Sequence, residues 1–321
     1  MTGDPLAFHP HPAAWAAVAV LAVAVVGADR HFAPDPDRRL PRRRRWALAG
    51  AVVALVAATS WPLADLAAHW LLSALLVQRL LLTLAAAPLL LLALTPEALA
   101  GLTARRRVDA VFEWVTKPLV AVVVFSVVAV GTLVPHAVNA QATSAGWRAG
   151  ADVLLLVAGL VLWGPVLRHI PGASRPGPVG VAVYLFVQSV LPTWPAVLYV
   201  FAAHPYYAVY AHQALGLNPL ADQRLAGVLS KVGTLPVLWS VAWAALARAY
   251  KADRTGQDPD LLQWLDVERR LQRAERRQHR VRRRPLVAPR PGVWTHAPTV
   301  LPPGQRRHPE PPPPAEPPAA T

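Results

Sequence analysis

The sequence predicts an all-α polytopic membrane protein with seven transmembrane helices, an N-terminus outside and a cytoplasmic C-terminus. Of its 321 residues, 54% are hydrophobic and 16% are charged, whereas about a quarter of a soluble domain is charged. Seven apolar stretches approach the roughly 20 residues that cross a bilayer core about 30 Å thick as a helix. The basic residues gather in alternate connections, and this sets the orientation because Lys and Arg accumulate on the cytoplasmic side.

The first expected span covers residues 13–28. The leader before it contains Asp4, His9 and His11 but no Lys or Arg. It therefore lacks the basic region that opens a signal peptide, so we interpret this span as a retained helix with its N-terminus outside. The following segment, residues 30–45, contains seven arginines and is expected in the cytoplasm.

The second span is expected over residues 46–66 and the third over residues 69–95. The turn between them carries Asp65 and no basic residue, so it belongs outside. The third span contains Pro88, which is expected to kink its inner part because proline lacks an N–H and clashes with the preceding turn. The connection after it, up to residue 117, contains four basic residues and is assigned to the cytoplasm.

The four remaining spans complete the alternation and bring the C-terminus inside. They are expected over residues 118–136, 148–167, 179–201 and 225–250. All but four of the 32 Lys and Arg residues then fall on the cytoplasmic side. The exceptions are Arg79, Arg148, Arg224 and Lys231.

Three regions follow from this pattern: a membrane domain over residues 1–250, a basic segment over 251–284 and a proline-rich tail over 285–321. The basic segment begins with Asp258 as an expected N-cap and Pro259 at the first helical position. We expect an amphipathic helix on the anionic inner leaflet, with a disordered basic linker as the open alternative. The tail cannot bury a core and is expected to be unstructured.

Composition and motifs exclude several classes of protein. The chain has no Cys and a single Met, which removes disulfides, thiolate metal sites and thioether copper ligands. It has no phosphate-binding glycine loop, no His-Glu-x-x-His and no serine elbow, so we do not expect an enzyme. The net charge of +14 lies beside apolar spans. That placement fits membrane orientation and anionic lipids better than nucleic acid.

An arginine near the middle of the third span is the most unusual feature of the chain. A charge at this depth costs several kcal/mol by the lowest estimates and needs a partner. Helical side chains lean toward the helix N-terminus, so Arg79 should point outward. Asp152 lies about 6 Å inside the fifth span, at 1.5 Å per residue. We therefore predict an Arg79–Asp152 ion pair.

Further polar residues are expected in the same cluster, namely Gln78, Arg148 and Lys231, the last one beside Asp222 or Asp152. The cluster either clamps three helices together or binds a ligand. Its excess of cations would favour an anion or an acidic partner. A small-solute or ion transporter using Arg79, Asp152 and Lys231 is one functional hypothesis, although no inverted repeat is visible. A receptor has only the helix count in its favour.

The histidines offer one candidate metal site. His69 and His136 lie at the ends of spans on the outer side, and the candidate site would use both imidazoles as metal ligands. Two imidazoles far apart in sequence have no diagnostic spacing. The other outer histidines, His9, His11, His204 and His212, are interpreted as solvated.

The stretch Leu220 to Gly227 reads LADQRLAG, and its Asp222, Gln223 and Gly227 resemble the signature of the CtaG-like cytochrome c oxidase assembly proteins, a seven-helix membrane family. Other pieces agree in order over residues 13–250. They are Val77-Gln78, Ala87-Pro88-Leu89-Leu90, His136, Ala158-Gly159-Leu160, Trp163 and Pro165.

This resemblance implies a role in maturing a haem-copper terminal oxidase in the plasma membrane, through contact with oxidase subunits and with a possible link to copper supply. Such proteins usually carry histidines where this chain has Leu75 and Arg79 on the third helix, and Arg148 and Asp152 on the fifth. Arginine stays protonated and does not ligate a metal. A Met-Trp pair is replaced by Ser230-Lys231. We therefore expect an assembly factor whose metal site is altered or lost.

Overall fold

The computed structural model describes residues 6–32, 41–104, 106–167 and 176–254. All of them belong to one compact unit, Met1–Asp260. Within these ranges every regular element is helical and no strand is formed. The expected basic helix beyond residue 254 and the proline-rich tail lie outside the described residues.

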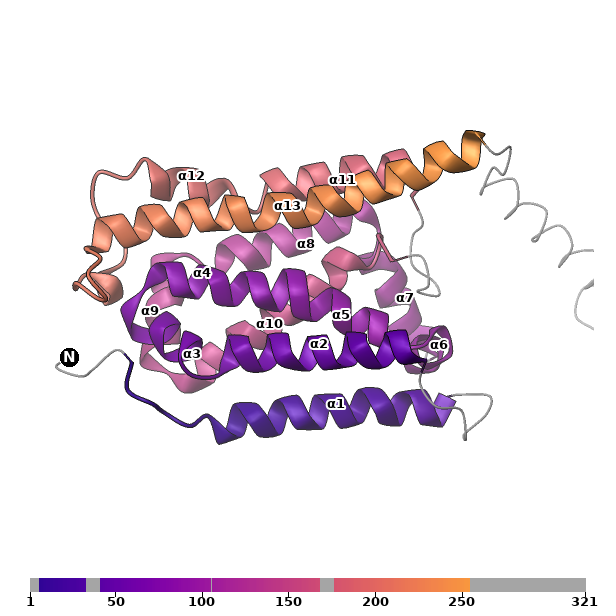
Figure 1. Cartoon of the computed structure of the whole chain (residues 1–321), viewed down its shortest axis with the longest axis horizontal. Coiled ribbons are helices and arrows are strands. Elements are labelled where there is room, and N and C mark those ends of the chain that lie inside the picture. The colour runs from indigo at the N-terminus through magenta and orange to yellow at the C-terminus, as the bar shows by residue number, and fades with distance from the viewer. Residues whose placement is uncertain (1–5, 33–40, 105, 168–175, 255–321) are drawn as a thin grey trace, which may run out of the picture. The chain divides into compact units, whose positions relative to one another are not determined.

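Long helical passes run back and forth along the bundle (Figure 1). They are α1 (Pro12–Phe32), α2 (Arg42–Thr59), the continuous α4 (Leu72–Leu80), η2 (Leu81–Ala86) and α5 (Ala87–Ala93), then α8 (Pro118–Gly131), α10 (Ala145–Trp163), the pair α11 (Pro178–Val190) and α12 (Trp194–Val200), and α13 (Pro219–Arg254). Shorter elements join them, namely α3 (Leu63–Asp65), η1 (Leu66–Trp70), α6 (Pro96–Thr103), α7 (Arg106–Val115), α9 (Pro135–Thr143) and η3 (Ala208–Tyr210).

The bundle has two distinct ends (Figure 1). We call the end formed by η1, α9 and residues 201–218 the loop end. The opposite end, which holds the start of α2 together with α6 and α7, is called the arginine end. The sequence places the loop end outside and the arginine end in the cytoplasm, and this orientation stays a prediction.

Length and hydropathy make the protein a multi-pass membrane protein. Among the described residues, five helices are long and apolar enough to cross a bilayer, and seven if each of two bent pairs counts as one span. One pair joins α2 to residues 63–70 with a 45° bend, and the other joins α7 to α8 with an 83° bend. The predicted all-helical membrane fold is therefore confirmed, whereas the count of seven stays a prediction.

The last two passes differ from their expected limits. α13 begins at Pro219, six residues before the expected start, because Asn218 caps it: the Asn218 Oδ1 accepts from the Ala221 N–H at 2.8 Å. Proline is favoured at the first helical position. The sixth pass is broken between α11 and α12, where Pro192 and Pro195 each remove a backbone donor.

The third pass contains a π-helical stretch, η2, immediately before Pro88. The indole Nε1 of Trp163 on α10 donates to the Thr83 carbonyl at 2.9 Å. A Cβ at Gly159 would lie 3.0 Å from the Thr83 Cα, so only glycine allows this approach. A widened turn that α10 packs against thus precedes Pro88, and the kink expected at Pro88 itself stays a prediction.

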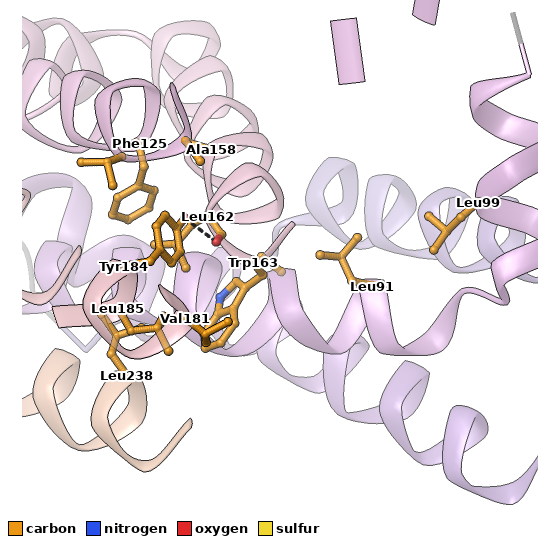
Figure 2. Close-up of a cluster of buried hydrophobic side chains, with 13 residues drawn as sticks. Leu91, Leu99, Phe125, Ala158, Leu162, Trp163, Val181, Tyr184, Leu185 and Leu238 are labelled. Carbon is orange, nitrogen blue, oxygen red and sulfur yellow. Dashed lines mark hydrogen bonds between the residues drawn. The ribbon is translucent and has the colours of Figure 1, made fainter. Parts of the chain in front are cut away.

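The hydrophobic core beside the contact of α10 with η2 is shown in Figure 2. It includes the rings of Trp163 and Tyr184, and the polar atom of each ring makes a hydrogen bond. The Tyr184 hydroxyl on α11 donates to the Leu162 carbonyl on α10 at 2.7 Å. Phe125 and Leu238 bring α8 and α13 into the same cluster. Buried tyrosine usually pairs its hydroxyl in this way. The cluster also contains Ala87 and Leu91 of α5, so it joins five passes.

Candidate functional site

Arg79 is buried in α4, with 6% of its surface exposed. Its Nη1 donates to the Thr132 hydroxyl at 2.7 Å, and its Nη2 donates to the Thr132 carbonyl at 2.9 Å and to the Gln141 Oε1 at 3.2 Å. Thr132 is the C-cap of α8 and Gln141 lies on α9. The guanidinium fork therefore joins α4 to the α8–α9 connection through charge-assisted hydrogen bonds, which are among the stronger ones in proteins.

The predicted ion pair between Arg79 and Asp152 is wrong. Among the described residues, no carboxylate lies within the 4.0 Å ion-pair limit of Arg79. Asp152 on α10 instead accepts from the Gln78 Nε2, at 3.3 Å to each carboxylate oxygen. Neighbouring residues on an α-helix point about 100° apart. Because Gln78 faces α10, Arg79 must face α8 and α9.

Arg148 lies one turn before Asp152 on α10 and belongs to the same region. Its Nε donates to the Gln141 carbonyl at 3.2 Å and its Nη2 to the Ala142 carbonyl at 3.4 Å. These carbonyls are in the last turn of α9, where a cation is favoured by the helix dipole. Gln78, Arg148 and Asp152 line a small cavity of about 10 Å³. Four of the predicted cluster residues therefore meet between α4, α9 and α10.

Lys231 is not part of this cluster. Its Nζ donates to the Thr193 hydroxyl at 2.6 Å and to the Ser189 carbonyl at 3.4 Å, so it bridges α13 to the break between α11 and α12. The expected partners, Asp222 and Asp152, accept from other groups. Arg79, Asp152 and Lys231 thus have three different sets of hydrogen-bond partners, and the transporter hypothesis built on them stays an untested prediction.

Asp222 on α13 caps the start of α4. The Leu72 N–H donates to its Oδ2 at 2.6 Å and the Ser73 N–H to its Oδ1 at 3.2 Å, and the Ser73 hydroxyl also donates to it. The carboxylate is 2% exposed. The first N–H groups of a helix have no partners within it, and a negative charge there is favoured by the dipole. Asp222 therefore supplies from α13 the cap that α4 lacks in its own sequence.

The other two signature residues hold the loop end together. The Gln223 Oε1 accepts from the Tyr206 N–H at 2.7 Å, and its Nε2 donates to the His204 carbonyl at 3.4 Å. A Cβ at Gly227 would lie 2.7 Å from the Ala196 carbonyl oxygen. Gln223 thus fixes residues 204–206 on α13, and Gly227 allows α12 to lie directly against α13.

Two tyrosines in the loop were not predicted to be structural, because their sequence context is that of an exposed connection. The Tyr207 hydroxyl donates to the Leu133 carbonyl at 2.6 Å, and the Tyr210 hydroxyl to the Ala67 carbonyl at 2.5 Å. Both are buried, and burial raises the pKa of each phenol. They therefore stay protonated and act as donors at neutral pH. The one sequence feature that could have indicated their structural role is the presence of three tyrosines within the five residues 206–210.

A central cavity of about 60 Å³ lies beside Arg79, between the third pass, α8, α11 and α13. Two buried polar atoms at this cavity have no hydrogen-bond partner among the described residues, the Arg79 Nε and the Gln188 Oε1. One is a donor and the other an acceptor. The volume is that of a few water molecules, at roughly 10–15 Å³ each on this measure. The cavity is therefore small, and its lining combines apolar side chains with Arg79, Gln188 and the hydroxyl residues Thr83, Thr193, Ser230 and Thr234.

The two candidate metal ligands, His69 and His136, lie on two different elements of the loop end. His69 is half-buried on η1 and His136 is exposed on α9. Among the described residues, no group of three or more His, Asp or Glu side chains is placed to hold a metal ion. His9 and His11 are not simply solvated as expected, because both contact Asp65, at 3.4 and 3.1 Å. Metal binding by His69 and His136 therefore stays a prediction.

The fold and the site define the class of the protein: a multi-pass helical membrane protein whose buried polar residues join its helices at one end. Its family follows from sequence comparison. The chain belongs to the cytochrome c oxidase caa3 assembly factor family, which matches residues 19–252. The match runs from the first half of α1 to the last turn of α13. No curated protein and no solved structure matches the chain.

Proposed function

We propose that this protein assists the maturation of a haem-copper cytochrome c oxidase in the plasma membrane by binding oxidase subunits, not by carrying copper to them. The family match over residues 19–252 carries the link to the oxidase. The role is one of assembly, and no catalytic group is assigned. Contact with oxidase subunits is proposed as the mechanism because the buried polar residues form hydrogen bonds within the fold.

Two observations support contact over copper transfer. The family signature and the buried cluster are occupied by internal hydrogen bonds: Asp222 caps α4, Gln223 holds the loop, and Arg79 joins three helices. Copper(I) prefers thiolate and thioether ligands, yet the chain has no Cys and one Met. What the loop end offers to a partner is its exposed face, which includes His204 and Tyr206.

The test of the function is deletion of the gene followed by complementation. Membranes of the deletion strain should contain less assembled oxidase, measured by the haem a absorbance difference spectrum, while oxidase transcripts stay unchanged. Normal oxidase content in the deletion strain would contradict the proposal. Complementation with the full chain should restore the spectrum.

A second measurement separates contact from copper supply. If the protein only supplied copper, excess copper in the medium should restore oxidase in the deletion strain, whereas a contact role predicts no rescue. The purified protein should also contain less than stoichiometric copper and zinc. A stoichiometric metal that is lost in His69→Ala or His136→Ala would show that the metal site is intact.

The partner itself can be captured by cross-linking. A photoreactive amino acid in place of Tyr206, which is 39% exposed at the loop end, should cross-link to an oxidase subunit in membranes. The matched control is Trp114, which is 55% exposed on α7 at the arginine end. Equal cross-linking from both positions would refute the assignment of the loop end as the contact face.

A further inference from the structure

A cleft of about 620 Å³ at the arginine end has no role in the assembly function proposed above. Five passes contribute to it: the start of α2, the end of α5, residues after α10, the start of α11 and the last part of α13. Figure 1 shows the C-terminal part of α13 running apart from α2 and α5 at this end. The cleft therefore opens where the helices diverge.

The lining combines three arginines with apolar walls. Arg43 and Arg44 come from α2 and Arg248 from α13, and the other lining residues are Leu, Val, Ala and Pro, among them Leu92 and Val241. Among the described residues, no Asp or Glu lines the cleft. Arg44 is held in place because its Nη1 donates to the Leu94 carbonyl. Three positive charges thus face a space without a compensating carboxylate among the described residues.

The backbone of α2 adds to this positive field. Its N-cap is Pro41, which makes no side-chain capping hydrogen bond. The first N–H groups of the 18-residue helix, those of Arg42 and Arg43, therefore have no intrahelical acceptor. Such an N-terminus favours phosphate and other anions. The arginine side chains and the N-terminus of α2 therefore both favour a negatively charged ligand.

We propose that this cleft binds one anionic phospholipid, with the phosphate between Arg43 and Arg248 and the adjoining glycerol and first methylenes along the apolar walls. The volume lies within the roughly 300–1,000 Å³ of ordinary ligand pockets and far exceeds a free phosphate. A soluble anion would leave the walls of Leu92, Val181 and Val241 uncovered, whereas a phospholipid at the membrane boundary covers them.

The experiment compares lipid binding to the full chain, purified in nonionic detergent, by native mass spectrometry. Phosphatidylglycerol should be retained in preference to phosphatidylcholine. The double variant R43Q/R248Q should bind phosphatidylglycerol roughly 25-fold more weakly, at about fivefold for each arginine near a charged lipid. Arg44 is left unchanged because its hydrogen bond to Leu94 supports the fold.

The matched control is R42Q/R45Q, which removes the same number of charges, both of them from the start of α2, where Arg43 also lies. Both residues are exposed and neither lines the cleft, so binding should fall less than threefold. Ala245→Phe, which fills the cleft without changing charge, should weaken binding as the double variant does. Equal losses in the two double variants would overturn the proposal in favour of general surface attraction. Inorganic phosphate that displaces the lipid at equal concentration would overturn it in favour of a free-anion site.

Discussion

Removing the Asp222 carboxylate should loosen the start of the third pass. In Asp222→Ala, the N–H groups of Leu72 and Ser73 lose their acceptor, and both residues are buried. A buried donor left unsatisfied costs about 1–3 kcal/mol, so the variant should lose roughly 2–5 kcal/mol of unfolding free energy. Asp222→Asn keeps one carbonyl acceptor and should lose about half as much. Ser73→Ala removes only the hydroxyl bond and should lose about 1 kcal/mol.

The assay is thermal unfolding of the purified protein in detergent. One kcal/mol shifts the Tm by about 2–4 °C for chains of 150–250 residues, so Asp222→Ala should unfold roughly 5–15 °C below the unchanged protein. Asp109→Ala, which removes an exposed carboxylate on α7, is the matched control and should shift the Tm by less than about 2 °C. A Tm for Asp222→Ala equal to that of the control would refute the capping role.

Two further predictions concern packing and pairing. Gly227→Ala places a Cβ 2.7 Å from the Ala196 carbonyl oxygen and should lower the free energy of unfolding by about 1–3 kcal/mol. The control Gly150→Ala has nothing within 4 Å of its added Cβ and should leave the free energy of unfolding unchanged or raise it by up to about 1 kcal/mol. The same Tm for both variants would contradict the close contact of α12 with α13. Double-mutant cycles with Asp152→Asn should give a coupling of about 0.5–3 kcal/mol to Gln78→Leu and a smaller one to Arg79→Gln. A larger coupling to Arg79 would mean that the direct ion pair exists after all.

Much of the fold was predictable because membrane-spanning segments obey simple rules. The apolar stretches and the positions of the arginines predicted most limits of the passes to within four residues. The larger differences are the end of α2, at Thr59 and not at residue 66, the end of α8 and the start of α13. A span is recognised from the mean hydropathy of about 20 residues, so one atypical residue does not hide it. The limits of α13 were missed because they depend on one capping side chain, Asn218, and not on the apolar pattern.

The candidate site was predictable in membership and not in pairing. Gln78, Arg79, Arg148 and Asp152 do lie in one region, because depth along a helix follows from residue number. Which of two neighbouring residues faces which helix depends on rotation about the helix axis, and 100° separates Gln78 from Arg79. The sequence alone does not fix that rotation, and the wrong choice moved the expected partner of Asp152 by one residue.

The contacts of the signature residues indicate which surface of the chain a partner would recognise. Asp222, Gln223 and Gly227 lie within two turns of α13, and each acts on a different neighbour: α4, the loop and α12. All three residues are thus engaged in contacts within the fold. The signature determines the shape of the loop end, since the position of residues 201–218 depends on Gln223 from α13 and on the phenols of Tyr207 and Tyr210 beneath. We infer that the signature acts through this shape, so a partner should recognise the exposed outer face of the loop and lose affinity when any of these supports is removed.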